Sequence, residues 1–341
     1  MRNKLLILLL AFPVFLVKAQ DLTDIRASRH DPVYTTYAAP PERTSYLTDQ
    51  GYQLQWYDES SGIAFLSAAG PGFGMAFQIG NRLIYKLEQL HQEPVITTSL
   101  SDLVELNFKL TEGLKINLFF AVYSSRAALA EYRLENTGCR PLTVTLHPWL
   151  LFPSADTSLF IRKNGAQTFE FPLYKPRDSW MKQHNIPLEE RFNGRWSLSG
   201  ISTIRGKVFA RTIPDDAFGP GEDPLDPLIN SLLPWYRKSI AVQGVIRQRT
   251  VTIYPGDVTK IRMVTEVNPA KMLPRPGYTT HTETLHRLAV DELVNQSRAA
   301  YRVIPVQDFP DNDHKLLYIS AFALMRQCMM PPEGSCHFLY Y

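Results

Sequence analysis

Three aromatic side chains have the type and setting for binding chemistry. Trp180 lies in the segment 172–195, and Trp235 and Tyr236 lie in the segment 213–238. Both segments are rich in Pro, Asp and Gly and are longer than ordinary hairpin loops, so we predict that they are loops. An aromatic ring can pack on the apolar face of a sugar while polar neighbours bind its edge. The three aromatics are therefore candidates for sugar stacking.

The second predicted loop also carries aspartates that could gather a cation such as calcium. Asp215, Asp216, Asp223 and Asp226 are close in sequence but lack the regular spacing of a known calcium loop. A solvated acidic loop is the favoured interpretation. No metal ligand is assigned, and no pattern in the sequence calls for a cofactor.

Common catalytic signatures are absent from the sequence. It contains no HExxH, GxxxxGK[ST], GxSxG or CxxC, so zinc protease, nucleotide-binding and serine hydrolase chemistry lack their residues. The glycines at 70, 72 and 74 are expected to form a tight turn or bulge before a strand, not a phosphate loop. His281 and His286 lie five residues apart, off one helical face, and are expected to be solvated.

Apolar and polar residues alternate with period two through much of the chain, which predicts strands. Segments 104–110 and 116–122 are expected to be antiparallel neighbours. Segments 130–134 and 142–146 are expected to form a second pair around the turn at Asn136-Thr137-Gly138. Many strands with one apolar face bury those faces best in two stacked sheets, so we predict a large antiparallel β-sandwich, mainly β, over residues 21–268.

Two helices are predicted after the sandwich. A linker, 269–310, contains one helix with these residues on one face: Leu285, Leu288, Ala289 and Leu293. The second helix covers 311–330, capped by Asp311 or Asn312 and ended by Pro331-Pro332. It is apolar on nearly every face and needs neighbours all round. We therefore expect 311–341 to begin a helical domain that is truncated here; a terminal helix packed on the sandwich is the alternative.

The N-terminus predicts export. Arg2 and Lys4 precede an apolar run over residues 5–17, and Val17-Lys18-Ala19 offers the small residues that a signal peptidase reads. The run falls short of the roughly 20 residues that span a membrane. Residues 1–20 are therefore interpreted as a cleaved signal peptide, and the mature protein as periplasmic or secreted. Loss of three basic residues takes the formal charge from +3 to zero, which favours neither nucleic acid nor a membrane surface as partner.

The cysteines are too few and too scattered for a disulfide framework. Cys139, Cys328 and Cys336 are expected to be buried thiols. A pair between Cys328 and Cys336, across the turn that ends the last helix, is the alternative.

Two stretches resemble parts of glycoside hydrolases. Residues 130–150 resemble the sheet core of the super-sandwich domains that precede helical-barrel catalytic domains. Their sequence is AEYRLENTGCRPLTVTLHPWL. Residues 315–341 resemble the first barrel helix and the first substrate-facing loop of glycoside hydrolase family 63, the mannosyl-oligosaccharide glucosidase type. Their sequence is KLLYISAFALMRQCMMPPEGSCHFLYY. The second similarity is the more specific of the two.

The family resemblance implies an (α/α)6 barrel after the sandwich. In that barrel an Asp general acid and a Glu general base, about 6.5–9.5 Å apart, would invert the anomeric centre. Both would lie downstream of Tyr341, so no catalytic residue is assigned here. The implied pocket residues lie in the first substrate-facing loop: Pro331, Pro332, Glu333, Phe338, Tyr340 and Tyr341. A turn that ends the helix, with ordinary packing of these side chains, is the alternative.

The resemblance thus implies the non-catalytic N-terminal portion of an exported inverting α-glycosidase-like enzyme. Its partners would be an oligosaccharide or glycan and the helical barrel. A stand-alone carbohydrate-binding module, using the aromatics Trp180, Trp235 and Tyr236, is the second interpretation. A ligand-free structural protein of the periplasm or cell surface is the third.

Overall fold

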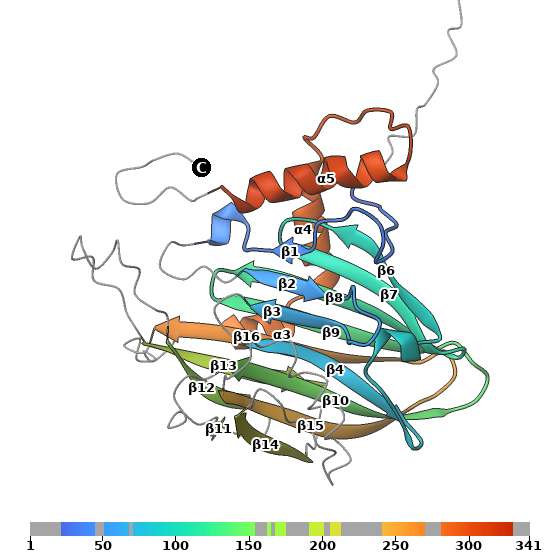
Figure 1. Cartoon of the computed structure of the whole chain (residues 1–341), viewed down its shortest axis with the longest axis vertical. Helices are drawn as coiled ribbons and strands as arrows, with labels where there is room; N and C mark the ends of the chain where they lie inside the picture. Colours follow the sequence, from blue (N-terminus) through green and yellow to red (C-terminus); the bar gives the residue numbers. More distant parts are fainter. Residues whose placement is uncertain are drawn as a thin grey trace, which may run out of the picture.

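A computed structural model describes residues 22–44, 51–67, 71–153, 162–164, 168–174, 191–200, 205–212, 241–269 and 281–329. Within these ranges the chain is mainly β, with two antiparallel sheets of eight strands each and helices near its C-terminal end (Figure 1). The two sheets stack face to face. This confirms the β-sandwich that the alternating pattern predicts.

The first sheet has the strand order β1-β2-β3-β4-β10-β15-β14, with β5 beside β4. Its strands are β1 (Thr36–Tyr37), β2 (Tyr52–Gln55), β3 (Ala64–Ser67), β4 (Gly72–Ile79), β5 (Arg82–Ile84), β10 (Leu142–Pro153), β14 (Arg205–Thr212) and β15 (Ala241–Ile253).

The second sheet has the strand order β11-β12-β13-β16-β9-β8-β7-β6. Its strands are β6 (Gln92–Ser99), β7 (Leu103–Thr111), β8 (Leu114–Ser124), β9 (Ala127–Asn136), β11 (Arg162–Asn164), β12 (Thr168–Tyr174), β13 (Arg191–Ser199) and β16 (Val258–Pro269).

The core lies between the sheets and is rich in aromatic rings. On β7, Leu106 and Phe108 are buried, whereas Glu105 and Asn107 on the opposite face are half-buried. β7 pairs with β8, which confirms the first predicted strand pair. Phe120 of β8 stacks on Phe65 of the opposite sheet with ring centroids 3.9 Å apart. Such contacts bury the apolar face of each sheet and so hold the two layers together.

The second predicted strand pair is wrong. β9 pairs with β8 and β16, whereas β10 pairs with β4 and β15 in the other sheet. The turn at Asn136-Thr137-Gly138 is therefore a corner that carries the chain from one sheet to the other. β15 and β16 are joined by a second corner of the same kind.

Two predicted loop regions also need correction. The segment expected to be a loop from residue 172 onward begins within β12, and Pro172 pairs with Asn193 of β13. Gly72 and Gly74 lie inside β4, in register with β10, and form neither a turn nor a bulge. Trp149 of β10 explains why residue 74 is a glycine, because a Cβ atom at this position would come within 2.6 Å of the Trp149 indole ring.

Five helical segments accompany the sheets among the described residues. They are the 3-10 turns η1 (Pro41–Arg43) and η2 (Leu87–Gln89) and the helices α3 (His281–Arg287), α4 (Val290–Tyr301) and α5 (Asn312–Gln327). None of the helices in the described part of the chain is long and apolar enough to cross a membrane.

The single linker helix expected from the sequence is two helices. α3 ends at Arg287 and α4 begins at Val290. Arg262 of β16 lies at this break, where its guanidinium donates to the carbonyl oxygens of Leu285 and Leu288 at 2.5 and 2.9 Å. Carbonyl oxygens at the end of a helix have no intrahelical partner, and the guanidinium supplies one. Leu285 and Leu293 are buried as expected, but Ala289 is exposed.

The last helix, α5, begins as predicted. The Asp311 carboxylate accepts a hydrogen bond from His314 N at 2.9 Å, which is an N-cap contact. One face of α5 is buried and carries Leu316, Ile319 and Ala323. Other apolar residues of the helix remain exposed. This one-sided burial differs from a helix that is enclosed all round.

Hydrogen bonds connect α5 to the N-terminal segment of the chain. Lys315 Nζ donates to Asp24 O at 2.7 Å, and Tyr34 N donates to Ser320 Oγ at 3.1 Å. Near the other end of the helix, Gln327 Nε2 donates to Thr36 O at 2.5 Å. Figure 1 shows α5 lying across β1, with η1 at its C-terminal end. The contacts fix the position of α5 relative to the first sheet.

Candidate functional site

The residues that the sequence singled out for sugar binding lie outside the described residues. These are Trp180, Trp235, Tyr236, Pro331, Pro332, Glu333, Phe338, Tyr340 and Tyr341, together with the four aspartates of the acidic loop. The structure therefore neither brings them together nor separates them. The candidate site that it does show is formed by other residues.

A polar cleft of about 160 Å³ opens where four segments meet. η1 and the turn between β6 and β7 form one side, and α4 and the last turn of α5 form the other. Its lining residues are Pro40, Glu42, Arg43, Asp102, Gln296, Ser297, Ala300, Tyr301 and Arg326. Small-molecule sites are concave and contain a few convergent polar groups on a mostly apolar lining, and this cleft shares the concavity and the convergent polar groups. We call it the η1–α4–α5 cleft.

The floor of the cleft is buried and rigidly held. Asp102 is 3% exposed, and its Oδ2 accepts a hydrogen bond from Ser297 Oγ at 2.6 Å. Tyr301 Oη accepts a hydrogen bond from Ser101 N at 2.7 Å. Ser101 O in turn accepts from Gln327 Nε2 of α5 at 3.1 Å. These bonds join the β6–β7 turn to both helices.

Burial dominates the electrostatics of the floor. It raises the pKa of Asp102, although the hydrogen bond from Ser297 and the charges of Arg43 and Arg326 act in the opposite direction. Burial also raises the pKa of Tyr301 to about 12. Titratable groups with perturbed pKa values in a cleft are a marker of functional sites.

Two guanidinium groups form the rim. Arg43 Nε donates to Tyr123 O at 2.5 Å, and the Arg43 guanidinium lies 4.7 Å from the centroid of the Tyr123 ring. Arg326 Nη2 lies 3.6 Å from Glu42 Oε1, while its Nε is buried without a hydrogen-bond partner. The rim thus presents N–H donors toward a floor that contains a carboxylate.

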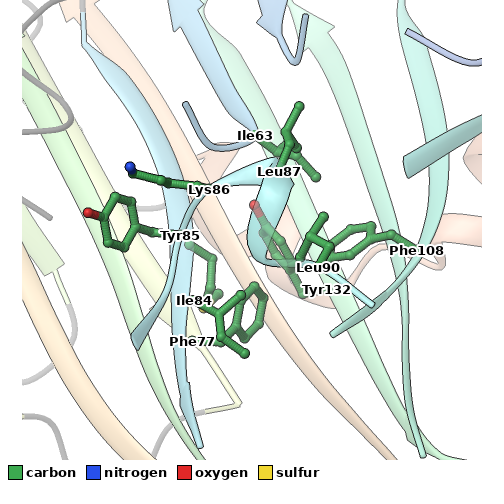
Figure 2. A pocket seen from close by; sticks show the side chains of 10 residues that line it. Ile63, Phe77, Ile84, Tyr85, Lys86, Leu87, Leu90, Phe108 and Tyr132 are labelled. Atoms are coloured by element: carbon green, nitrogen blue, oxygen red, sulfur yellow. The ribbon is translucent and has the colours of Figure 1, made fainter. Parts of the chain in front are cut away.

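A second cavity is apolar and lies inside the sandwich. Its volume is about 20 Å³, enough for about one water molecule. Figure 2 shows Leu87, Leu90 and Phe108 around the Tyr132 ring, whereas the polar ends of Tyr85 and Lys86 point away. The Tyr132 hydroxyl is buried without a hydrogen-bond partner. The size of this cavity excludes a sugar.

Other buried carboxylates serve the packing of α3 and α4. Glu131 accepts from Arg133 Nε at 2.7 Å and from Arg262 Nε at 3.0 Å. Glu266 accepts from Asn268 Nδ2 at 3.0 Å and from Thr282 N at 3.3 Å, at the start of α3. Both carboxylates are therefore fully engaged in structural contacts.

Two histidines, His147, which is buried, and His286, which is half-buried, are neutral near pH 7. His286 is not solvated as the sequence suggested: its Nε2 lies 2.8 Å from Ser197 Oγ. Burial, with a smaller effect of Arg262, lowers the pKa of His286 to about 4. Burial likewise lowers the pKa of His147 to about 4. No group of three or more potential metal ligands occurs among the residues that the structure describes.

The cysteines differ from expectation. Cys139 and Cys328 are free and exposed, so the prediction of buried thiols is wrong for both. Cys139 follows the corner turn at Asn136, and Cys328 caps the C-terminus of α5. Both positions are at the ends of elements, where exposure is common.

Sequence reasoning missed every residue of the η1–α4–α5 cleft. Asp102 stands in an unremarkable Ser-Asp turn between two strands, and Arg43 follows a Pro-Pro-Glu stretch. Arg326 lies on the last helix, whose sequence is distinguished mainly by its apolar residues. A helical pattern places Gln296, Ser297 and Ala300 on adjacent turns, which is the one local signal that the sequence carried.

No protein-family model matches the sequence, and no curated protein matches it. Solved structures align with it at low identity. A glycosyl hydrolase of the GH92 family aligns over 95% of this chain and 44% of its own, with 11% identity and a TM-score of 0.42. A family GH92 alpha-mannosidase from Bacteroides thetaiotaomicron aligns over 87% and 40%, with 11% identity and a TM-score of 0.39. Heparan sulfate lyase HepC from Pedobacter heparinus aligns over 74% and 37%, with 8% identity and a TM-score of 0.41. The chain therefore spans less than half the length of each of these proteins.

Proposed function

We propose that this chain is the non-catalytic sandwich portion of an exported glycosidase-like enzyme that acts on oligosaccharides. The observation that supports it most is the setting of α5. One face of α5 packs on the sandwich, while Leu317, Leu324 and Met325 on other faces are 55%, 41% and 44% exposed. A helix with apolar residues on several faces suits a barrel in which neighbouring helices cover it.

The three buried carboxylates of the described residues, Asp102, Glu131 and Glu266, fit a non-catalytic role. Inverting hydrolysis needs an acid and a base on opposite sides of the glycosidic bond, about 6.5–9.5 Å apart. Glu131 and Glu266 are engaged in structural contacts, and Asp102 is held by Ser297 at the floor of a small cleft. A helical barrel packed on α5 would supply the catalytic pair.

The finer assignment rests on the resemblance of residues 315–341. It favours an enzyme of the family 63 type that acts on α-linked sugars with inversion. In this proposal the loop with Pro331, Pro332 and Glu333 faces the substrate, and Tyr340 and Tyr341 contribute to the pocket wall.

A hydrolysis assay tests the proposal. The purified chain is incubated with a panel of α-linked glucosides and mannosides, and released sugar is measured. We expect no turnover, because Glu333 would be the one acidic residue in the resembling loop and would lack a facing partner. Turnover that survives repurification and disappears in Glu333→Gln would show a complete active site within this chain and overturn the proposal.

A further inference from the structure

We propose that the η1–α4–α5 cleft binds one neutral sugar ring, or a polyol of similar size, through adjacent hydroxyl groups. Its occupant is inferred from three properties of the cleft: the mixture of donors and acceptors, the balance of charge, and the volume.

The donors come from the two rim arginines. Arg43 Nε is used by Tyr123 O, which leaves the two Nη groups of Arg43 for other partners. Arg326 Nε is buried without a hydrogen-bond partner, and its Nη2 is 3.6 Å from Glu42, too far for a hydrogen bond. The Nε atom is closed off from the cleft, so the Nη groups of Arg326 are the donors that a ligand oxygen can use.

The acceptors lie on the floor and rim. Asp102 Oδ2 already accepts from Ser297, and the other carboxyl oxygen of Asp102 has lone pairs available. Glu42 provides a second carboxylate at the rim. A sugar hydroxyl both donates and accepts, so two adjacent hydroxyls can satisfy a guanidinium and a carboxyl group together.

The balance of charge favours a neutral ligand over an anion. Two arginines line the cleft, and so do the two carboxyl groups of Glu42 and Asp102. A phosphate or carboxylate that approached the arginines would also meet the carboxylate of Glu42, 3.6 Å from Arg326 Nη2. Repulsion of like charges would then offset much of the attraction.

The volume limits the ligand to a single ring. The cleft measures about 160 Å³ and is smaller than the roughly 300 Å³ at which sites for drug-sized ligands begin. A cleft of this size holds several water molecules, which one edge of a sugar ring can replace. The hydrogen bonds of Ser101 to α4 and α5 hold the floor in place before binding.

Ligand-observed NMR titrations test the proposal. D-glucose, D-mannose, sodium acetate and inorganic phosphate are each titrated into the full chain. We expect saturable binding of at least one sugar and none of acetate or phosphate. Arg326→Gln and Asp102→Asn should each weaken sugar binding by about 10-fold or more, the effect of losing one hydrogen bond to a charged group. Arg302→Gln is the matched control, because Arg302 is exposed at the end of α4 and does not line the cleft.

Several results would overturn the proposal. They are the absence of saturable sugar binding, binding of the anions alone, and sugar binding that both cleft variants retain. If a variant did not fold, amide shifts of the parent protein would decide. Sugar-induced shifts at residues 101–103 and 296–301 would support the site, and shifts confined to other regions would exclude it. Failure here leaves the hydrolysis assay unaffected, so the two proposals can be judged separately.

Discussion

The side chain of Asn136 donates a hydrogen bond to the carbonyl oxygen of Ile253 at 2.8 Å. Asn136 ends β9 and Ile253 ends β15, so this bond joins the two corners at which the chain passes between the sheets. The same amide group donates to Arg140 O, also at 2.8 Å. Gly256 N donates to Asn136 O at 2.9 Å. The two corners are therefore held together as one unit, with Asn136 fully buried at the centre.

Asn136→Ala should lower the free energy of unfolding by about 2–4 kcal/mol, because two carbonyl groups lose a buried donor. Asn117→Ala is the matched control. Asn117 is half-buried on the outer face of the second sheet and donates to Asn107 Oδ1 at 3.1 Å. Its loss should cost about 1 kcal/mol or less. Urea denaturation of both variants measures the difference, and equal losses would contradict the central role of Asn136.

The corners show where sequence reasoning succeeds and where it stops. The alternation of Leu106 and Phe108 with polar residues predicted both the strands and their buried faces. Asn136-Thr137-Gly138 predicted a change of direction. Neither signal says whether the next strand joins the same sheet, because β10 pairs with strands that are distant in sequence, β4 and β15.

The candidate site was unpredictable for the same reason. Arg43, Asp102, Ser297 and Arg326 come from four segments, and none of them belongs to a motif. Their proximity follows from the packing of α4 and α5 on the sheet ends. The break between α3 and α4 was not predicted either, and the carbonyls at the break bind Arg262 of a different element, β16.

Glu131→Gln should destabilise the protein by about 3–5 kcal/mol, the cost of breaking a buried ion pair. Glu131 is 2% exposed and pairs with Arg133 and with Arg262, which also holds the α3 carbonyls. Glu135→Gln on the same strand is the matched control. Glu135 is half-exposed and lies 3.7 Å from Lys115, so its loss should cost at most about 1 kcal/mol. Denaturation curves that showed similar losses would mean that Glu131 is not a key contact.

Acid should destabilise the protein between pH 6.5 and about 4. Burial lowers the pKa of His147 from 6.5 to about 4, so the unfolded chain binds a proton in this window and the folded protein does not. Stability is therefore lost as the pH falls, by up to about 1.4 kcal/mol per pH unit for one such group. His286 adds to the same trend.

His147→Gln should flatten this pH dependence, since glutamine does not titrate. Urea denaturation at several pH values between 4.5 and 7.5 measures the slope for the variant and the parent protein. The exposed His91→Gln is the control and should keep the parent slope. An unchanged slope in His147→Gln would assign the acid sensitivity to other groups.

Export should remove the first residues of the chain. The basic residues Arg2 and Lys4, followed by the apolar run, predict cleavage after Ala19 or Gln20. Mass spectrometry of protein recovered from the periplasm or medium of an expressing bacterium would give the N-terminus. Recovery of an intact Met1 from that fraction would argue against a cleaved signal peptide.

The exposed residues of α5 should make the isolated chain associate. Leu317, Leu324 and Met325 present apolar surface that, in the proposed enzyme, neighbouring helices would cover. Leu317→Glu combined with Leu324→Glu should reduce association, because charged side chains disfavour burial of this face in a contact. Static light scattering over a range of protein concentrations measures the average mass.

The control for α5 is Val258→Glu, which places a carboxylate at an exposed apolar position of β16, 49% exposed and away from the helix. It should leave association unchanged. A parent protein that stayed monomeric at all concentrations would remove the main support for a barrel packed on α5. Association that persisted in the α5 variant and decreased in Val258→Glu would show that the chains associate through the sheet. The proposed domain contact would then have to be sought on the sheet.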